Sequence, residues 1–398
     1  MKPVIIIGSG HAGLSMAREL RTRAPELPIR LISREPIHAY YKPSLSKALS
    51  MAKEPQDLVT KTVGELETEL NVQMDSQTQV QTIEPQNQSL RLKQVSGNIE
   101  TLFYQNLVLA TGASPFLPPI KRDPTIPFFT VNSLEEYRVF RTALQPGLHV
   151  LIIGAGFVGT ELASDLCSSG HTVSVVDKCH WPLQRVIPDT LGTAIRQSMA
   201  AEGVDWHFGQ SIESLFLVGN KPHAHLSNGA QLPCDLVVSA AGLIPNTELA
   251  RHAGLEVETG IIVSAYGETS STGIYALGDC AQYEWGTLPF ISPITQAAKA
   301  MAMTLTGNPS RVNLPTLAVP VKIPACPTVV SPPLQSKGMW EVQGSAQDLE
   351  AHFISPHGKL LGFALTGSAV ARRSSLLARC LHERGAPGGV SNAPTHAA

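Results

Sequence analysis

The sequence lacks closely spaced cysteines. Zinc ligands and vicinal redox disulfides come in short spacings such as CxxC or CxxxxC, and the chain has neither. We therefore expect no metal site and no redox-active cysteine pair. Scattered cysteines in an intracellular chain are most often small, buried apolar side chains. The six are Cys167, Cys179, Cys234, Cys280, Cys326 and Cys380.

Long apolar runs and an excess of one charge are also missing. No stretch approaches the roughly 18 apolar residues that span a bilayer. The apolar run Val4–Ile7 leads directly into a glycine-rich loop, which argues against a signal peptide. The net charge of −2 argues against general nucleic-acid binding. We expect a cytoplasmic protein, without membrane insertion or nucleic acid, whose 398 residues form two or three domains.

Two glycine fingerprints stand out. One is Gly8-Ser9-Gly10-His11-Ala12-Gly13, after the apolar residues 4–7, and the other is Gly154-Ala155-Gly156-Phe157-Val158-Gly159, after the apolar residues 150–153. Each lies where a strand turns into a helix and where backbone can approach a pyrophosphate. One such motif is weak evidence, because glycines also make tight turns without a ligand. Two of them predict two dinucleotides bound at once.

A third motif, residues 269–279, is a short apolar strand that ends in Gly278-Asp279. An acid at a strand end can accept hydrogen bonds from a polyol chain. Strand-then-turn segments also occupy residues 107–113 and 237–246. In this order the motifs resemble those of the two-dinucleotide-fold flavoprotein reductases. The resemblance implies that Asp279 holds FAD and that the two segments cross between an FAD and an NAD domain.

The resemblance also implies a set of FAD contacts around these motifs. The strand at residues 29–32 ends at Ser33 rather than at an acid, so the ribose partner stays open between Ser33 and Glu35. The expected FAD-binding residues are Gly8, Ser9, Gly10, His11, Ala12, Gly13, Ser33, Arg34, Glu35, Lys42, Val80, Ala110, Thr111, Gly112, Asp279, Ile291 and Lys322.

The second nucleotide is expected to be NADH. Asp177 follows Gly154 by 23 positions, close to the roughly 20 expected for an acid that binds a ribose 2′-hydroxyl. Its charge would repel the 2′-phosphate of NADPH, although Lys178 would soften that repulsion. Glu161 either helps to place the nicotinamide or is an ordinary acid near a helix N-terminus. The expected NAD-binding residues are Gly154, Gly156, Phe157, Val158, Gly159, Glu161, Asp177 and Gly242.

Residues 40–47, Tyr-Tyr-Lys-Pro-Ser-Leu-Ser-Lys, stand where disulfide reductases of this fold carry their cysteines. The segment is similar to the rubredoxin reductases and flavorubredoxin reductases, while its trailing Lys47 also matches the reductases of oxygenase ferredoxins. Residues 319–333 resemble the rubredoxin–NAD reductases and imply that Lys322 approaches the flavin. A cation there, Lys42 or Lys322, would stabilise the anionic reduced ring. The alternative is a pair of solvated surface lysines.

The resemblance implies an FAD-dependent NADH:rubredoxin reductase without acid–base catalytic residues, in which Lys42, Lys322 and Glu161 tune the flavin. Its partner would be rubredoxin or a similar small acidic iron protein, in alkane degradation, nitric oxide detoxification or oxygen scavenging. Alternatives are a ferredoxin reductase, a flavorubredoxin reductase, an NADH oxidase or an NADH-sensing flavoprotein. The cations expected around the acceptor are Lys42, Lys47, Lys322, Arg372, Arg373 and Arg379. We expect a monomer or a homodimer.

The predicted fold is α/β, with two Rossmann-like dinucleotide-binding domains, the second inserted in the first, and a small α+β C-terminal domain. The FAD domain would span residues 1–115 and 241–315, the NAD domain 116–240 and the C-terminal domain 316–384, with a disordered tail at 385–398. Within these limits we expect a helix at 159–169, a strand at 172–176, a helix from Pro293, an extended edge at 319–327, a hairpin at 352–365 and a final helix from Ser368 to His382.

Overall fold

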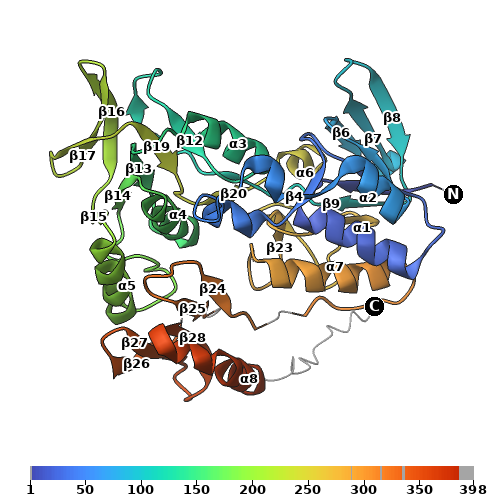
Figure 1. Cartoon of the computed structure of the whole chain (residues 1–398). Helices are drawn as coiled ribbons and strands as arrows, with labels where there is room; N and C mark the ends of the chain where they lie inside the picture. Colours follow the sequence, from blue (N-terminus) through green and yellow to red (C-terminus); the bar gives the residue numbers. More distant parts are fainter. Residues whose placement is uncertain (1, 288, 314–315, 334–336, 385–398) are drawn as a thin grey trace.

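The computed structural model describes residues 2–287, 289–313, 316–333 and 337–384. Its first layer is a five-stranded parallel sheet in the order β22-β9-β1-β2-β5. Four of its strands come from residues 4–109 and the fifth, β22, from residues 274–276, and Ile274 on β22 pairs with Leu107 on β9. Helices α1 (His11–Arg23) and α7 (Ile291–Leu305) pack together beside this sheet (Figure 1). The strands are β1 (Val4–Ile7), β2 (Ile29–Ile32), β5 (Gln73–Asp75), β9 (Asn106–Leu109) and β22 (Ile274–Ala276).

A second parallel sheet, in the order β12-β19-β13-β14-β15, has its own apolar core. It is formed entirely by residues between 128 and 239, so this unit is inserted between β9 and β22 of the first sheet. The strands are β12 (Phe128–Thr130), β13 (His149–Ile153), β14 (Thr172–Asp177), β15 (Val204–Phe208) and β19 (Leu236–Ser239), and the helices are α3 (Leu134–Ala143), α4 (Phe157–Ser168) and α5 (Asp189–Ala201).

The two units are joined by a two-stranded antiparallel ribbon. The outgoing strand β10 (Ala113–Pro115) pairs with the returning strand β20 (Leu243–Pro245), with Ser114 opposite Ile244. The side chain of Asn246 fastens the ribbon, because its Oδ1 accepts a hydrogen bond from Ser114 Oγ at 2.7 Å and its Nδ2 donates to the Thr111 carbonyl at 2.8 Å. The chain therefore enters and leaves the inserted unit at one place.

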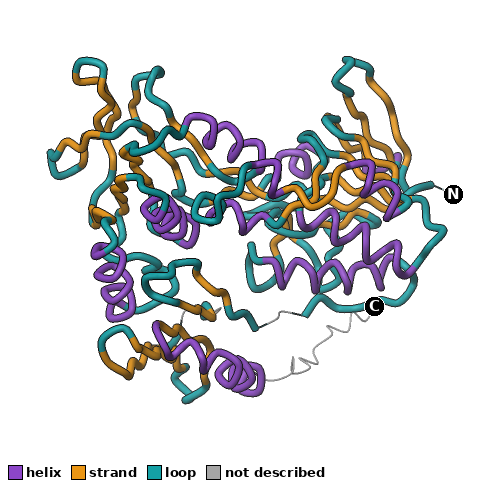
Figure 2. The backbone as a smooth tube through the Cα atoms, in the orientation of Figure 1, coloured by secondary structure: helices purple, strands orange, loops and turns teal. Residues whose placement is uncertain are grey.

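The C-terminal part forms a five-stranded antiparallel sheet in the order β24-β25-β28-β27-β26, covered by α8 (Arg373–Arg384). This sheet lies below the inserted unit in Figure 1, and Figure 2 shows its strands and helix as a separate layer. Its apolar residues join the core of the inserted unit through Val321, Ile323 and Leu349. The strands are β24 (Val319–Val321), β25 (Thr328–Ser331), β26 (Met339–Ser345), β27 (Asp348–Ile354) and β28 (Leu360–Thr366).

The remaining elements are smaller and surround the first two sheets. They are β3 (His38–Tyr40), β4 (Val59–Thr62), α2 (Val63–Leu70), β6 (Gln79–Glu84), β7 (Ser89–Lys93), β8 (Ile99–Phe103), β11 (Lys121–Arg122), β16 (Ile212–Val218), β17 (Lys221–Leu226), β18 (Gln231–Pro233), α6 (Glu248–His252), β21 (Ile261–Ile262), β23 (Ala281–Gln282) and the 3-10 helices η1 (Lys42–Lys47), η2 (Pro55–Leu58), η3 (Pro85–Asn87) and η4 (Gly367–Arg372).

The predicted fold class is confirmed. The hairpin is also confirmed, as β27 and β28, and so is the edge position of the proline-rich segment, as β24. The prediction of one final helix from Ser368 was wrong. A 3-10 helix occupies Gly367–Arg372, where the Asp348 carboxylate accepts from the Ser368 N–H at 2.6 Å, and α8 begins only at Arg373. The helix expected at 159–169 begins two residues earlier, at Phe157.

The proposed domain limits stay a proposal, and the tail at 385–398 lies outside the described residues. Among the residues that the structure describes, no helix is long and apolar enough to cross a membrane.

Candidate functional site

The first glycine loop follows β1 at the carboxyl edge of the first sheet. Two of its glycines are required by packing alone. A Cβ on Gly8, whose φ is +116°, would lie 2.1 Å from the Ala110 carbonyl oxygen, and one on Gly13 would lie 1.8 Å from the Gly8 carbonyl oxygen. Side chains at these positions would push β9 and α1 away from β1. These glycines therefore explain the fold rather than a ligand.

The middle glycine behaves differently. A Cβ on Gly10 would meet no atom within 4 Å, and the residue has an ordinary extended backbone at the N-cap of α1. Nothing in the protein itself requires glycine there. An open approach to unpaired N–H groups at a helix N-terminus fits a phosphate group. The loop therefore fits the pyrophosphate of a dinucleotide.

The second glycine loop repeats this arrangement. A Cβ on Gly154 would lie 2.5 Å from the Ala240 carbonyl oxygen and one on Gly159 would lie 1.9 Å from the Gly154 carbonyl oxygen, while Gly156 faces open space. Asp177, at the end of β14, accepts hydrogen bonds from Ala155 N at 2.5 Å and Cys179 N at 2.7 Å. Its carboxylate thus lies beside the loop, at the position expected for a ribose contact.

Parallel strands bring most of the expected FAD residues to one edge, because the carboxyl ends of β1, β2, β9 and β22 lie side by side. After β2, the buried Ser33 hydroxyl accepts a hydrogen bond from Ser9 Oγ at 2.8 Å. Arg34 and Glu35 are exposed on the turn that follows. Of the two candidates for the FAD ribose contact, Ser33 is hydrogen-bonded to the glycine loop, whereas Glu35 is exposed to solvent.

Asp279 lies at the start of the turn after β22, near Lys42 and His11. Burial raises the pKa of Asp279, and the charges of Lys42 and His11 oppose that rise. Burial likewise lowers the pKa of Lys42 and of His11, with Asp279 opposing both. Three weakly solvated ionisable groups thus face one another. A carboxylate there gains from hydroxyl donors, so the group fits a ribityl chain.

The other expected residues are distributed around this edge. Ala110, Thr111 and Gly112 follow β9, and the Thr111 hydroxyl donates to the Asn246 carbonyl at 2.8 Å. Val80 lies on β6 and packs against the first core. His11 Nε2 lies 3.0 Å from Thr295 Oγ1, which ties α1 to the first turn of α7.

Glu161 is the most constrained side chain of the site. It is 4% exposed on α4, where Oε2 accepts from Ser46 Oγ at 2.5 Å and Oε1 from Lys322 N at 3.1 Å. The Lys322 ammonium also forms an ion pair with Oε2. The sequence suggested Lys322 as a flavin neighbour and Glu161 as a nicotinamide or helix-terminal acid, but it did not suggest that they pair.

Asp165, one helical turn further along α4, was missed by the sequence analysis. It is 3% exposed, and its two oxygens accept from Leu49 N at 3.0 Å and Ser50 N at 2.9 Å. Glu161 and Asp165 together fasten η1 and the segment after it to α4. Two acids four residues apart on an apolar helix are the signal that was available.

The second glycine loop contacts the segment before α7 through aromatic rings. Phe157, the first residue of α4, lies edge-on to Phe290, the residue before α7, with ring centroids 6.1 Å apart. Ile291 begins α7, while Val158 is 47% exposed and Gly242 has a φ of +117° beside β20. Among the expected NAD residues, Phe157 therefore contacts the residue that precedes α7.

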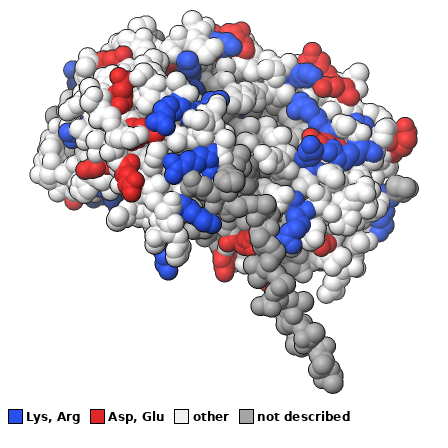
Figure 3. All heavy atoms as spheres, turned by 90° about the horizontal axis from the view of Figure 1, so that it is seen from below, with Lys and Arg blue, Asp and Glu red and all other residues white. Residues whose placement is uncertain are grey.

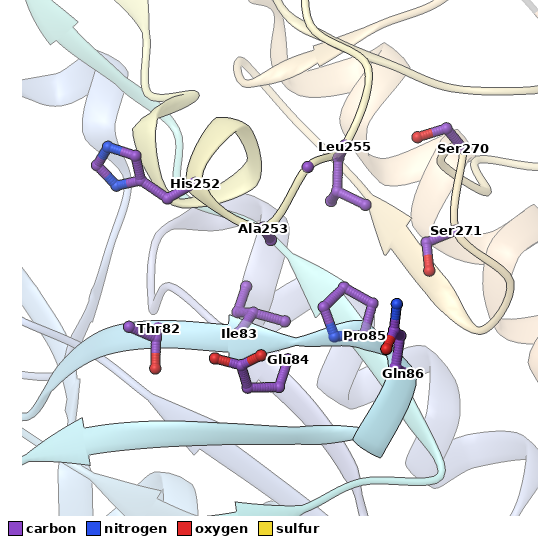
Figure 4. A pocket seen from close by; sticks show the side chains of 11 residues that line it. Thr82, Ile83, Glu84, Pro85, Gln86, His252, Ala253, Leu255, Ser270 and Ser271 are labelled. Atoms are coloured by element: carbon purple, nitrogen blue, oxygen red, sulfur yellow. The ribbon is translucent and has the colours of Figure 1, made fainter.

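A separate concavity of about 420 Å³ lies away from these loops. Figure 4 shows its walls, which come from β6, η3 and the end of α6, with Ser270 and Ser271 on the other side. None of the residues expected to bind FAD or NAD lines it. In the described part of the chain, no group of three His, Cys, Asp or Glu side chains could hold a metal ion.

Comparison with known proteins supports the two-nucleotide interpretation. Residues 2–304 match the family described as pyridine nucleotide-disulphide oxidoreductase, and residues 311–380 match the rubredoxin binding C-terminal domain. The chain is 36% identical to a rubredoxin-NAD(+) reductase of Alcanivorax borkumensis over 378 residues, covering 94% of this chain and 98% of the relative.

It is also 36% identical to a nitric oxide reductase FlRd-NAD(+) reductase of Vibrio vulnificus, covering 94% of this chain and 97% of the relative. Among solved structures it is similar to a ferredoxin reductase from Rhodopseudomonas palustris, with 28% identity, a TM-score of 0.85 and coverage of 94% and 93%. The putidaredoxin reductase–putidaredoxin complex gives 26% identity, a TM-score of 0.86 and coverage of 95% and 93%. The chain belongs to the pyridine nucleotide-disulphide oxidoreductases, an FAD- and NAD(H)-dependent enzyme family, and within it to the rubredoxin–NAD reductases.

Proposed function

We propose that this protein is an FAD-dependent NADH:rubredoxin reductase. The observation that carries the proposal is the pair of glycine loops, each with an open middle glycine, next to a C-terminal part that matches a rubredoxin-binding domain. FAD bound at the first loop supplies the chemistry, since a flavin accepts hydride and releases single electrons.

The protein's own residues bind and orient the two nucleotides. Gly10 and Gly156 leave room for the two pyrophosphates, Asp279 accepts from the ribityl hydroxyls and Asp177 from the NADH ribose. Ser33 is our choice for the FAD ribose side, since it already bonds Ser9. Lys42 and Lys322 place positive charge beside the ring, which favours the reduced anion.

The acceptor must come to the flavin edge. Cys167, Cys179, Cys234, Cys280 and Cys326 form no disulfide, and Cys234, Cys280, Cys326 and Cys380 are buried. No cysteine pair stands in the Lys42–Lys47 segment, where disulfide reductases carry theirs. Electrons therefore leave through a docked protein rather than through a disulfide. An NADH oxidase of this fold would need a redox cysteine in that segment, which disfavours that alternative.

A flavorubredoxin reductase is the second candidate, favoured by the relative from Vibrio vulnificus. We place the protein in the cytoplasm, where NADH is produced, as a monomer or homodimer.

NADH-dependent cytochrome c reduction, measured with and without added rubredoxin, tests the proposal. We expect a large rubredoxin-dependent rate, and an equal rate without rubredoxin would contradict it. Replacing rubredoxin by flavorubredoxin or ferredoxin ranks the alternatives by kcat/KM.

A further inference from the structure

The C-terminal part differs in charge from the rest of the chain. Residues 311–380 contain seven Lys and Arg against three Asp and Glu, a net charge of +4. Because the whole chain carries −2, all other residues together carry −6. Figure 3 looks at the molecule from below, and Lys and Arg side chains flank the middle of this face. Such a separation of charge orients an acidic partner toward the C-terminal part.

Three arginines of this part are exposed on η4 and α8. Arg372 ends η4, Arg373 begins α8 and Arg379 lies two turns further along. We call them the arginine surface. Long arginines on a surface lose side-chain entropy of about 2 kcal/mol each when a partner immobilises them. A surface of this kind binds well only if some of that cost is removed beforehand.

Arg372 is held in place before any partner arrives. Its Nη1 lies 2.6 Å from Oε2 of Glu350, whose side chain is 5% exposed on β27, while the Arg372 side chain is 55% exposed. Oε1 of the same carboxylate accepts a hydrogen bond from Gln343 Nε2 at 3.3 Å. His352 Nε2 lies 2.5 Å from the same Oε1 atom, but the two do not have hydrogen-bond geometry. A guanidinium has five donors, so the exposed part of Arg372 can bind a further carboxylate.

Burying a carboxylate such as Glu350 is costly and rarely improves stability over apolar packing. A role in fixing the orientation of the exposed Arg372 side chain explains why the Glu350 carboxylate is buried beneath it. The arginine surface is also fixed relative to Lys322. The strand β25 pairs with both β24 and β28, and the first residue of η4, Gly367, donates from its N–H to the Pro327 carbonyl at 2.8 Å.

We propose that the arginine surface, with Arg372 as its preorganised anchor, is where the acidic electron carrier docks. This inference rests on the proposed function, because the carrier is the rubredoxin-type acceptor. Glu350 is a positioning residue, which acts on the carrier only through Arg372. The carrier's carboxylates bind a surface that packs against the same sheet as Lys322, so docking and the flavin environment share one rigid unit.

The test compares charge reversal at Arg372 with a matched reversal elsewhere. Arg372→Glu is expected to lower kcat/KM for rubredoxin about tenfold at low ionic strength, and the loss should shrink as salt screens the surface. Arg91→Glu, at an exposed position on β7, is the control and should leave the rate unchanged. Stopped-flow reduction of the flavin by NADH, measured in the same variants, reports whether the fold and nucleotide sites are intact.

Glu350→Gln separates anchoring from net charge. It makes the protein more basic, so steering by net charge alone predicts faster rubredoxin reduction. Anchoring predicts slower reduction, because Arg372 loses its charged partner. If the Glu350 variant does not fold, Arg372→Lys gives the same information, because it keeps the charge but loses the fixed guanidinium geometry: steering by net charge predicts an unchanged rate and anchoring predicts a slower one. An inactive wild type with rubredoxin would overturn the proposed function itself. An active wild type with equal rates for Arg372→Glu and Arg91→Glu would overturn only the docking surface.

Discussion

Glu161 and Lys322 form an ion pair across 161 positions of sequence, between the helix that follows the second glycine loop and the end of β24. The same carboxylate binds the Ser46 hydroxyl of η1. One side chain therefore joins the nucleotide-binding insert, the segment that carries Lys42 and the C-terminal sheet. Any movement of α4 when NADH binds would be transmitted to both lysines.

The Glu161→Gln variant should be destabilised. The Lys322 side chain is 25% exposed, so the loss is smaller than the 3–5 kcal/mol typical of a fully buried pair, and we expect about 2 kcal/mol. Urea denaturation of the FAD-loaded protein measures it. In Glu161→Gln/Lys322→Met the unpaired ammonium is removed as well, and part of the loss should return. If the single variant matched wild type, the pair would contribute nothing to joining the domains.

Alanine substitutions in the glycine loops separate folding from ligand binding. Gly10→Ala and Gly156→Ala should cost only about 0.5–1 kcal/mol in stability, because each Cβ meets open space and only the better N-cap preference of glycine is lost. Gly10→Ala should release FAD, whereas Gly156→Ala should keep FAD and raise KM for NADH. The matched controls Gly8→Ala and Gly154→Ala collide with backbone and should lower expression of folded protein. If Gly10→Ala kept its full FAD content, the assignment of the pyrophosphate to this loop would be wrong.

Much of the fold followed from local signals, while the connections between parts did not. The glycine loops and the alternation of strand and helix predict two nucleotide folds, because a strand, a tight turn and a helix are specified within about 30 residues. Asp177 was predicted because it ends a strand and Asp279 because it follows one in a Gly-Asp pair, and both binding roles stay predictions. The Glu161–Lys322 pair and the Asp165 contacts depend on how distant segments pack together. The spacing of residues in the sequence does not predict which distant segments come into contact.

The final helix shows the same limit on a smaller scale. Ser368 is a good N-cap by residue type, but it lies inside the 3-10 helix η4, where its N–H donates to Asp348 of β27. Arg372 was expected on that helix and lies at its entrance instead, where the buried Glu350 reaches it. The start of the final helix and the contact between Glu350 and Arg372 were thus visible only in three dimensions.

Replacing Asp177 should change the choice of nucleotide. In Asp177→Ala the ribose acceptor and the negative charge both disappear, so KM for NADH should rise and the gap to NADPH should narrow. Asp177→Asn is the matched control for the loop, since one amide oxygen can still accept from Ala155 N or Cys179 N. Steady-state kinetics with both nucleotides measures the effect. A wild type that already prefers NADPH would show that the ribose assignment is wrong.

FAD retention should depend on pH through Asp279. Burial raises its pKa above 3.8, so protonation begins at a higher pH than for an exposed aspartate. FAD that hydrogen-bonds the carboxylate binds the deprotonated form more tightly, so its Kd should rise as pH falls through the pKa of the free protein. Flavin fluorescence on release measures it. Asp279→Asn should bind FAD more weakly, and its Kd should depend little on pH. If the Kd of the wild type changed with pH in the same way as that of Asp279→Asn, Asp279 would not be the cause of the pH dependence.

Salt should slow the two half-reactions unequally. Reduction of the flavin by NADH takes place inside a protein site, while reduction of rubredoxin requires encounter between a C-terminal part of charge +4 and an acidic carrier. The Debye length falls from about 10 Å at 0.1 M to about 3 Å at 1 M, so steering is lost while contacts inside the site change less. Stopped-flow measurement of both steps from low to high salt should show a falling on-rate for rubredoxin and a nearly constant rate of flavin reduction. Because attraction speeds encounter more than it tightens the complex, dissociation should change less than association. A rubredoxin on-rate indifferent to ionic strength would leave the basic charge of the C-terminal part without a role in electron transfer.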